Sequence, residues 1–318
     1  MTQVGVIETG GTSTRVAIAD CAPDAAIGAA APAAARMGVG RLPRLLARET
    51  FATGDPATTL AKVAAWFRGS ELTAIGVAAF GPLELRRDAR DHGSLLATPK
   101  PGWSRYPLRH ALEHALALPV AIDTDVGAAA LGEQAAARDV ATLAYVTVGT
   151  GIGVGLAIDG AIHHGALHPE AGHLRVARAA GDRFAGLCPF HGDCLEGLAS
   201  GPALAARAGG DPATLPPDSA ALRDALAIEA DYLAQLVLAI IGLVAPHRLV
   251  LGGGVLRAPG LLAAVRVRAV ERAAGYSPLI ADAVCAERLL LPPGCGSDSA
   301  LIGAALLAAD APRRCAHG

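Results

Sequence analysis

The feature that most constrains the fold of this chain is a pattern that occurs twice: an apolar strand, a glycine turn and a second strand. The first copy spans residues 4–19 around "GVIETGGTSTR", and the second spans residues 142–158 around "TVGTGIGVG". Short apolar runs on both sides of a glycine turn predict a hairpin. At 318 residues the chain is long enough for about two domains. The repetition therefore predicts two α/β domains of related topology, with a cleft between them and a boundary near residues 117–122.

Between and after the two hairpins, predicted strands alternate with predicted helices. The strands are expected at residues 74–79, 119–122 and 248–251, and the helices at residues 60–67, 110–117, 127–138, 221–243 and 297–309. Such alternation is typical of α/β architecture. An alanine-rich stretch at residues 22–42 interrupts the pattern and is interpreted as an insertion after the first hairpin.

Composition excludes several classes of protein. Hydrophobic residues make up 52% of the chain and charged residues 18%, which is typical of a globular protein and not of a disordered one. The net charge of −2 gives no support for nucleic-acid binding through overall positive charge. Residues Met1 to Ala19 lack the basic segment with which a targeting signal begins. The longest apolar run, Tyr232 to Ala245, is too short to span a bilayer. We therefore expect a cytoplasmic protein with no membrane and no nucleic-acid partner.

The two glycine turns are candidate phosphate sites, because closely approaching backbone N–H groups and Thr hydroxyls suit a phosphate. The alternative is a tight hairpin without a ligand, and neither turn fits the P-loop pattern. Two matching turns favour a nucleotide held between two lobes. A third glycine run, "LVLGGGV" at residues 249–255, is a weaker signal for either a turn or a wall beside an adenine.

A carboxylate stands at the end of another predicted strand, in "PVAIDTDVGAAALGE". Asp125 follows the strand and precedes a helix. Residues at the carboxyl ends of strands in α/β sheets face the ligand crevice, so Asp125 could accept a proton from a substrate hydroxyl. The alternative is a helix N-cap, which position alone favours.

Cysteine and histidine gather in "HPEAGHLRVARAAGDRFAGLCPFHGDC", residues 168–194. Two thiolates and two imidazoles, from Cys188, His191, Cys194 and His173, would make a closed tetrahedral zinc site of the structural type. Two alternatives stay open: a Cys188–Cys194 disulfide, which a reducing compartment disfavours, and His168 as the fourth ligand in place of His173. The remaining histidines of this region, His163 and His164, are interpreted as surface residues. Cys21, Cys285, Cys295 and Cys315 are interpreted as free thiols.

These motifs, in this order, resemble the ROK family of bacterial sugar kinases, within the actin-like (ribonuclease H-like) ATPase superfamily. The resemblance covers nearly the whole chain and is strongest to the fructokinase branch. It rests on "GVAAFGPLEL", "GSLLATPKPGWSRYPL", "IDTDVGAAALGE", "YVTVGTGIGVG", "HPEAGHLRV", "CPFHGDCLEGLASGPA" and "LVLGGGV".

The resemblance implies a role for each motif. Gly10, Gly11 and Thr12 would form the first phosphate loop, with Glu8 near a magnesium ion. The second phosphate loop would contain Thr147, Gly149, Thr150 and Gly151, and the adenosine would lie beside Gly252 and Gly253. Asp125 would be the general base. The sugar pocket would be lined by Thr124, Glu170, His173 and Glu196, with the segment Thr98 to Trp103 closing near it. The domains would be residues 1–118, joined by a C-terminal helix near 299–318, and residues 119–298.

The sequence departs from the family at four positions and at the 22–42 insertion. In the first loop, Glu8 replaces the usual aspartate, and Ser13 stands where a lysine is common. Near the expected base, Gly127 stands where the family usually has an asparagine two residues after the base, and Thr124 stands where many members have an asparagine just before it. The last two bear on the choice of sugar.

The motifs and the resemblance together imply an ATP-dependent hexose kinase, a fructokinase first of all, that uses Mg²⁺ and a structural Zn²⁺, and the family resemblance alone implies a homodimer. Three alternatives remain. The first is a kinase for glucose, mannose or an N-acetylhexosamine. The second is a sugar-responsive repressor, which we disfavour because the first phosphate loop begins at residue 8 and no helix-turn-helix precedes it. The third is a zinc-bearing scaffold protein with degenerate nucleotide loops.

Overall fold

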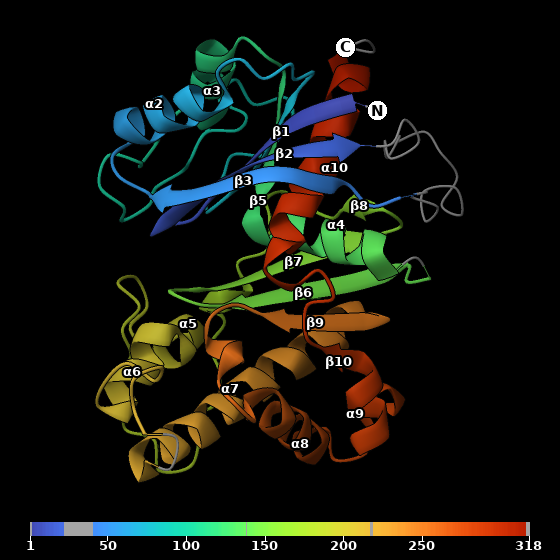
Figure 1. Cartoon of the computed structure of the whole chain (residues 1–318). Helices are drawn as coiled ribbons and strands as arrows, with labels where there is room; N and C mark the ends of the chain where they lie inside the picture. Colours follow the sequence, from blue (N-terminus) through green and yellow to red (C-terminus); the bar gives the residue numbers. More distant parts are fainter. Residues whose placement is uncertain (1, 22–40, 138, 217–218, 316–318) are drawn as a thin grey trace. The chain divides into compact units, whose positions relative to one another are not determined.

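The computed structural model describes residues 2–21, 41–137, 139–216 and 219–315, with side chains through Ala311 (Figure 1). Nearly all of the predicted insertion at residues 22–42, and the side chain of Cys315, lie outside this part of the chain. By its internal contacts the chain divides into two compact units. Unit 1 comprises Met1–Ala141, Gly155–Pro169 and Gly294–Gly318, and unit 2 comprises Thr142–Val154 and Glu170–Pro293.

The first sheet of the molecule belongs to unit 1 and has the strand order β3-β2-β1-β4-β5. Its strands are β1 (Thr2–Thr9), β2 (Ser13–Cys21), β3 (Arg44–Ala52), β4 (Ile75–Ala79) and β5 (Val120–Thr124). β1 pairs antiparallel with β2 and parallel with β4, and β4 pairs parallel with β5. The register places Thr9 beside Ala79, and Ala79 beside Thr124. The glycine turn after β1 and the Thr124–Asp125 junction after β5 therefore lie at the same edge of this sheet.

The helices in the described part of unit 1 are α2 (Pro56–Phe67), α3 (Leu108–Leu116), α4 (Asp125–Ala137) and α10 (Ser299–Cys315), which follows a short 3-10 helix, Gly296–Asp298. One core cluster joins α2, α3 and the loop after β4 to the sheet, and it includes Ile7, Val77, Leu83 and the fully buried Trp103. Burial of these large side chains is the main source of stability of unit 1.

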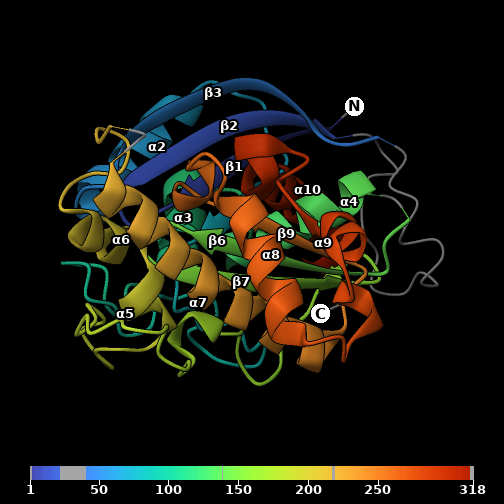
Figure 2. The same ribbon diagram turned by 90° about the horizontal axis from the view of Figure 1, so that it is seen from below.

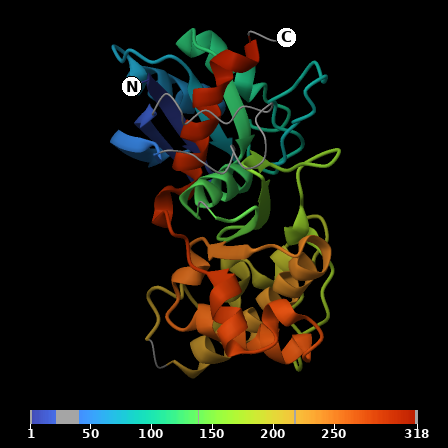
Figure 3. The same cartoon turned by 90° about the vertical axis from the view of Figure 1, so that its right-hand side faces the viewer.

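The C-terminal helix α10 packs on α4 and against β1, β4 and β5, as Figure 3 shows for the red helix beside the first sheet. The approach is close because glycines stand at the contacts. A Cβ added at Gly303 would lie 1.7 Å from the carbonyl oxygen of Ala128, and one at Gly76 would lie 1.8 Å from that of Ala304. Only glycine fits at either position.

The second sheet repeats the topology of the first. Its order is β10-β9-β6-β7-β8, with β6 (Thr142–Val148), β7 (Ile152–Ile158), β8 (Ala161–Ile162), β9 (Arg248–Gly252) and β10 (Leu290–Leu291). Taken from the other end, β8-β7-β6-β9-β10 corresponds strand for strand to β3-β2-β1-β4-β5. β6 pairs parallel with β9, and β9 with β10, as β1 does with β4 and β4 with β5. The predicted α/β class is confirmed, and the two sheets have the related topology that the repeated pattern predicts.

The helices of unit 2 are seen together in Figure 2. They are α5 (Leu195–Ala199), α6 (Gly201–Ala208), α7 (Ala220–Val244), α8 (Leu261–Ala273) and α9 (Ala283–Leu289), with 3-10 helices Ala171–His173, Val255–Arg257 and Pro278–Ile280. α7 contacts α5, α6 and α8. Its fully buried residues include Tyr232 and Leu233.

Within the described residues, α7 is the one helix long and apolar enough to cross a membrane, with a mean hydropathy of 1.8 over its most apolar window, half of which is buried. It has 25 residues, longer than the apolar run at residues 232–245 considered from the sequence. Buried core helices of water-soluble proteins pass the same test, and α7 is packed by three other helices of unit 2.

The contacts divide the chain differently from the boundary expected near residues 117–122. β5 and α4 belong to unit 1, because β5 hydrogen-bonds to β4 and α4 packs on α10. β3 was not predicted from the sequence; it is a largely exposed edge strand that carries Arg44, Arg48 and Glu49. The helices α5, α6, α8 and α9 were not predicted either.

Candidate active site and metal centre

Asp125 opens helix α4 directly after β5, as expected, but the helix cap is a different residue. The Oγ1 atom of Thr124 accepts the N–H of Gly127 at 3.0 Å, which is the N-cap bond to the third residue of the helix. Asp125 is half-buried, and its Oδ1 accepts the N–H of Val126 at 2.8 Å. A carboxylate in the first turn is stabilised by the positive end of the helix dipole. The alternative that Asp125 serves only as the cap is therefore weakened, because Thr124 fills that position.

Beside Asp125, Asp123 and His164 form a pair that was not predicted from the sequence. The Oδ2 atom of Asp123 lies 2.9 Å from Nε2 of His164, and its Oδ1 accepts the N–H of Thr124 at 2.7 Å. His164 is half-buried and not the surface residue expected from its turn, whereas His163 is exposed. A Cβ added at Gly127 would lie 2.6 Å from Oδ1 of Asp123 and 2.8 Å from Oγ1 of Thr124. The glycine at position 127 thus makes room for this pair.

The first glycine turn closes the β1–β2 hairpin and is open to solvent. The N–H of Gly10 donates to the carbonyl of Ser13 at 2.8 Å, and Gly11 and Thr12 are exposed. On the strand before the turn, Oε2 of Glu8 accepts a hydrogen bond from Arg15 at 2.8 Å. Burial raises the pKa of Glu8 above its usual value, and the Arg15 charge opposes that rise. Arg15 also binds Asp298, which in turn pairs with Arg48 at 2.7 Å.

The donor set at Glu8 fits a magnesium ion. Oε1 of Glu8 has no protein partner among the described residues, and Mg²⁺ is commonly held by one or two carboxylate oxygens together with substrate phosphates. The expectation that Glu8 lies near the ion stays a prediction.

In unit 2 the second glycine turn is held by helices α5 and α6. The N–H of Gly201 donates to the carbonyl of Gly149 at 2.7 Å. Oε2 of Glu196 accepts the N–H of Ile152, the first residue after the turn, at 3.0 Å. A Cβ added at Gly151 would lie 2.5 Å from the same oxygen. Glu196, expected in the sugar pocket, therefore supports the second glycine turn.

The third glycine run lies beside the second turn. Thr147 of β6 pairs with Gly252 of β9, and a Cβ added at Gly253 would lie 2.3 Å from the carbonyl oxygen of Val148. Gly253 also has a φ of +93°, which side-chain-bearing residues rarely adopt. The sheet thus brings together the two glycine segments of unit 2 that were expected to contact the nucleotide.

The four predicted metal ligands form one cluster. Their ligand atoms all lie within 4.8 Å of one another, in the set His173, Cys188, His191 and Cys194. The Nδ1 atom of His173 lies 3.7 Å from Sγ of Cys188 and 3.5 Å from Sγ of Cys194, and Nδ1 of His191 lies 3.7 Å from Sγ of Cys188. Ordinary Zn–S and Zn–N bond lengths in a tetrahedron put sulfur and nitrogen about 3.6 Å apart. The residues fit a zinc ion.

Neither alternative for these ligands matches the geometry. Cys188 and Cys194 are free thiols, as are Cys21, Cys285 and Cys295. His168 is buried elsewhere, where its Nε2 accepts the N–H of Leu83 at 2.9 Å. Glu170 lies beside the cluster, because its backbone carbonyl accepts the N–H of His173 at 3.0 Å. Glu170 itself is exposed.

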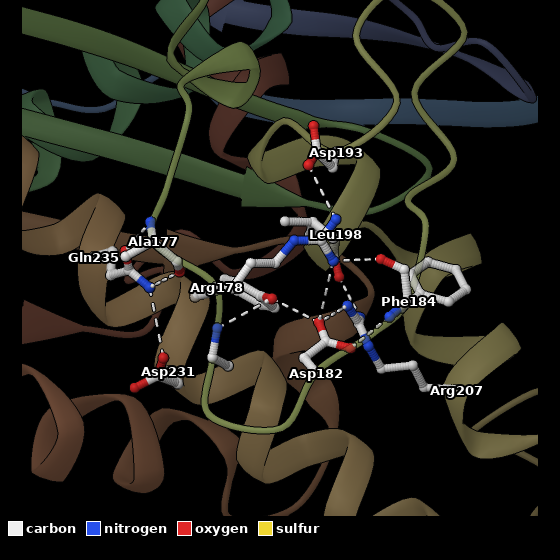
Figure 4. Close-up of polar contacts among 11 residues, drawn as sticks. Ala177, Arg178, Asp182, Phe184, Asp193, Leu198, Arg207, Asp231 and Gln235 are labelled. Carbon is white, nitrogen blue, oxygen red and sulfur yellow. Dashed lines mark hydrogen bonds and ion pairs between the residues drawn. The ribbon is translucent and has the colours of Figure 1, made fainter.

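A polar network, also not predicted from the sequence, connects the loop of the Cys/His cluster to the helices of unit 2 (Figure 4). Asp193, which precedes Cys194 of that cluster, pairs with Arg178 at 3.0 Å and with Arg175. Asp182 accepts hydrogen bonds from Arg207 at 2.8 Å and from the Tyr232 hydroxyl at 2.6 Å. Sequence separations of 15 to 50 residues leave no local signal for such pairs.

The chain is similar to known proteins over most of its length. The ROK family model matches residues 57–311. The fructokinase of Zymomonas mobilis is 39% identical over 274 residues, 83% of this chain and 89% of that protein, and the putative fructokinase of Bacillus subtilis is 35% identical over 266 residues, 83% and 88%. The crystal structure of a ROK hexokinase from Thermus thermophilus superposes with a TM-score of 0.74 at 25% identity and covers all of both chains. The chain therefore belongs to the ROK family, among its sugar kinases.

Proposed function

We propose that this ROK kinase transfers the γ-phosphoryl group of ATP to the 6-hydroxyl of D-fructose, releasing ADP and D-fructose 6-phosphate. The observation that carries the proposal is the position of Asp125, a half-buried carboxylate at the first turn of α4 whose capping role is taken by Thr124. The choice of fructose is supported by the likeness to relatives named as fructokinases.

Asp125 would act as the general base. Its carboxylate would accept the proton of the sugar hydroxyl as the hydroxyl oxygen forms a bond to the γ-phosphorus, while the bond from that phosphorus to the β,γ-bridging oxygen breaks and ADP leaves. The positive end of the helix dipole stabilises negative charge in the first turn, where Asp125 lies. The Asp123–His164 pair would fix the strand end that carries the base.

The nucleotide would be bound by the backbone groups of the glycine turns. We assign Gly10, Gly11 and Thr12 to the first phosphate loop and Thr147, Gly149, Thr150 and Gly151 to the second. Gly252 and Gly253 would face the adenosine. Glu8 would hold Mg²⁺, which supplies charge neutralisation at the transferring phosphoryl group.

The sugar hydroxyls would be bound by Glu170, His173 and Glu196, with Thr124 at the same strand end as the base. His173 would hold zinc through Nδ1 and leave Nε2 for a hydroxyl group. Zinc would order the loop and would have no open position for a water, since four protein ligands complete a tetrahedron. We further propose a cytoplasmic homodimer.

An ADP-release assay with Mg-ATP tests this function across fructose, glucose, mannose and N-acetylglucosamine. We expect the highest kcat/KM with fructose. A preference for another hexose would overturn the fructose assignment and leave the kinase, and it would direct attention to Thr124 and Gly127. Absence of turnover with all four sugars, together with retained ATP binding, would favour the scaffold alternative.

A further inference from the structure

The side chain of Lys100 lies on the first glycine turn. Its Nζ donates a hydrogen bond to the carbonyl of Gly11 at 2.5 Å and to the carbonyl of Thr53 at 3.2 Å. The sequence placed Lys100 in a segment expected to close near the sugar, so its contact with a phosphate loop is a difference from that expectation. The chain contains only one other lysine, Lys62.

The charge of Lys100 is not neutralised by the protein. None of the described carboxylates lies within ion-pair distance of its ammonium group, whose two hydrogen-bond partners are carbonyl oxygens. The other charges near the turn compensate one another, because Arg15 pairs with Glu8 and Asp298, and Arg48 pairs with Asp298. Lys100 therefore adds a net positive charge to the turn.

The turn beside Lys100 has unused donors. In the described part of the chain, the N–H groups of Gly11 and Thr12 make no hydrogen bond to another residue. An ammonium group has three N–H donors, and two of those of Lys100 are bound to carbonyls. Backbone N–H groups without a protein partner, beside an ammonium group with one N–H still unbonded, can together bind the oxygens of a phosphate group.

The backbone that carries Lys100 is firmly anchored. Trp103 is fully buried, donates from Nε1 to the carbonyl of Gly54 at 2.9 Å, and packs edge-on against Phe80 and Tyr106. The lysine is thus held near the turn before any ligand arrives, which reduces the entropy lost on binding.

We propose that Lys100 is the phosphate-binding cation of the first glycine turn and contacts a phosphate group of the nucleotide. This inference rests on the proposed kinase function, since it identifies the residue that recognises the charge of ATP in unit 1. It also assigns the segment Thr98 to Trp103 to the nucleotide and not to the sugar.

Competitive acylation of the two lysines tests the proposal directly. The full-length protein is treated with a trace of acetic anhydride, alone and with ATP, tripolyphosphate or fructose, and acylation of Lys100 and Lys62 is read by peptide mass spectrometry. We expect ATP and tripolyphosphate to slow acylation of Lys100, and fructose alone to leave it unchanged. Lys62, which lies 5.8 Å from the ring centroid of Phe51, is the internal reference.

Steady-state kinetics provide the second measurement. We expect Lys100→Met to raise the KM for ATP about 10- to 100-fold, the effect of losing one hydrogen bond to a charged group, and the KM for sugar less than about twofold. Lys100→Arg should recover part of the ATP affinity, and Lys62→Met should match the wild type.

Two results would overturn the proposal for Lys100 alone: ATP binding that leaves its acylation rate unchanged, or a Lys100→Met variant in which only the KM for sugar rises. Failure of the wild type to bind ATP at all would instead overturn the kinase function, and this inference with it. Calorimetric titration with ATP distinguishes the two cases.

Discussion

The carboxylate of Glu196 accepts a hydrogen bond from the backbone N–H of Ile152, with 3.0 Å between Oε2 and the nitrogen. Glu196 lies in the first turn of α5, two residues after Cys194 of the Cys/His cluster, and Ile152 is the first residue of β7 after the second glycine turn. Within unit 2, the loop of the Cys/His cluster and the second glycine turn are therefore joined through one side chain. A substitution in either of these two segments should therefore affect the structure of the other.

This link predicts that substitutions at Glu196 and Gly151 are not additive. Glu196→Ala should lower the free energy of unfolding by about 1–3 kcal/mol, because the Ile152 N–H loses its acceptor. Gly151→Ala should also destabilise, because its Cβ would lie 2.5 Å from Oε2 of Glu196, but it should cost much less once that carboxylate is gone. Urea unfolding of both single variants and the double variant measures the coupling.

Gly149→Ala is the control for the Glu196–Gly151 cycle. A Cβ added at Gly149 meets no atom within 4 Å. Its effect on stability should be the same with and without Glu196. Strict additivity of the Gly151 and Glu196 variants would contradict the link.

Replacement of the proposed base should separate binding from chemistry. Asp125→Asn keeps the size of the side chain and removes its ability to accept the proton, so kcat should fall about 10²- to 10⁴-fold. The dissociation constants for ATP and fructose, measured by calorimetry, should change only a few-fold. Asp88→Asn, at an exposed aspartate of the same unit, is the control. A variant at position 125 with nearly normal kcat would remove Asp125 from the mechanism.

The metal centre should hold one zinc ion per chain and stabilise unit 2. Cys188→Ser should abolish bound zinc, measured by elemental analysis, and lower the melting temperature, because metal binding contributes directly to the free energy of folding. Cys285→Ser changes a free thiol outside the cluster and should alter neither quantity. Wild-type protein that is free of zinc but melts at an unchanged temperature would refute the assignment.

Gly127 sets two physical effects against each other. Alanine favours a helix over glycine by about 1 kcal/mol, yet a Cβ at position 127 would collide with the Asp123 carboxylate and the Thr124 hydroxyl. We expect the cost of the collision to exceed the gain in helix propensity. Gly127→Ala should therefore lower the melting temperature, and it should reduce kcat because the end of the strand is displaced. Gly242→Ala in α7 is the matched control, because its Cβ meets nothing within 4 Å, and it should stabilise the protein. If both variants are more stable than the wild type, the side chains around Asp123 can move to make room for a Cβ at position 127.

Glu229 should make the stability depend on pH. It is fully buried in α7, neither carboxylate oxygen has a hydrogen-bond partner among the described residues, and burial raises its pKa well above the usual value, against the charge of Arg207. The folded state therefore binds the proton more tightly than the unfolded state. Stability is highest below the unfolded pKa, near 4.5, and falls as the pH rises towards the folded pKa, by about 1.4 kcal/mol per pH unit in that interval.

Glu229→Met removes this penalty, so the variant should gain more in melting temperature over the wild type at pH 8 than at pH 5. Arg207 keeps its bond to Asp182 in the variant. Glu287→Met, on the exposed side of α9, should show no such trend. Equal gains at both pH values would mean that Glu229 is ionised in the folded protein.

Local patterns were enough to predict much of this protein. The two hairpins, the α/β class, the buried strands and the long helix α7 follow from hydrophobic periodicity and glycine turns. The four residues of the Cys/His cluster lie within 22 residues of one another along the chain, so spacing and residue type could identify them as candidate metal ligands. Asp125 was found because it follows a buried strand, although position could not show that Thr124 would be the cap.

Tertiary structure decided the contacts between these pieces. Lys100 and Gly11 are 89 residues apart, Glu196 and Ile152 are 44 apart, and His164 and Asp123 are 41 apart. Which of them meet depends on the order and register of the strands and on how the loops pack, and neither leaves a periodic signal in the sequence. A polar side chain has the same local propensity whether it faces water or a partner, so the partner is chosen only when the chain folds.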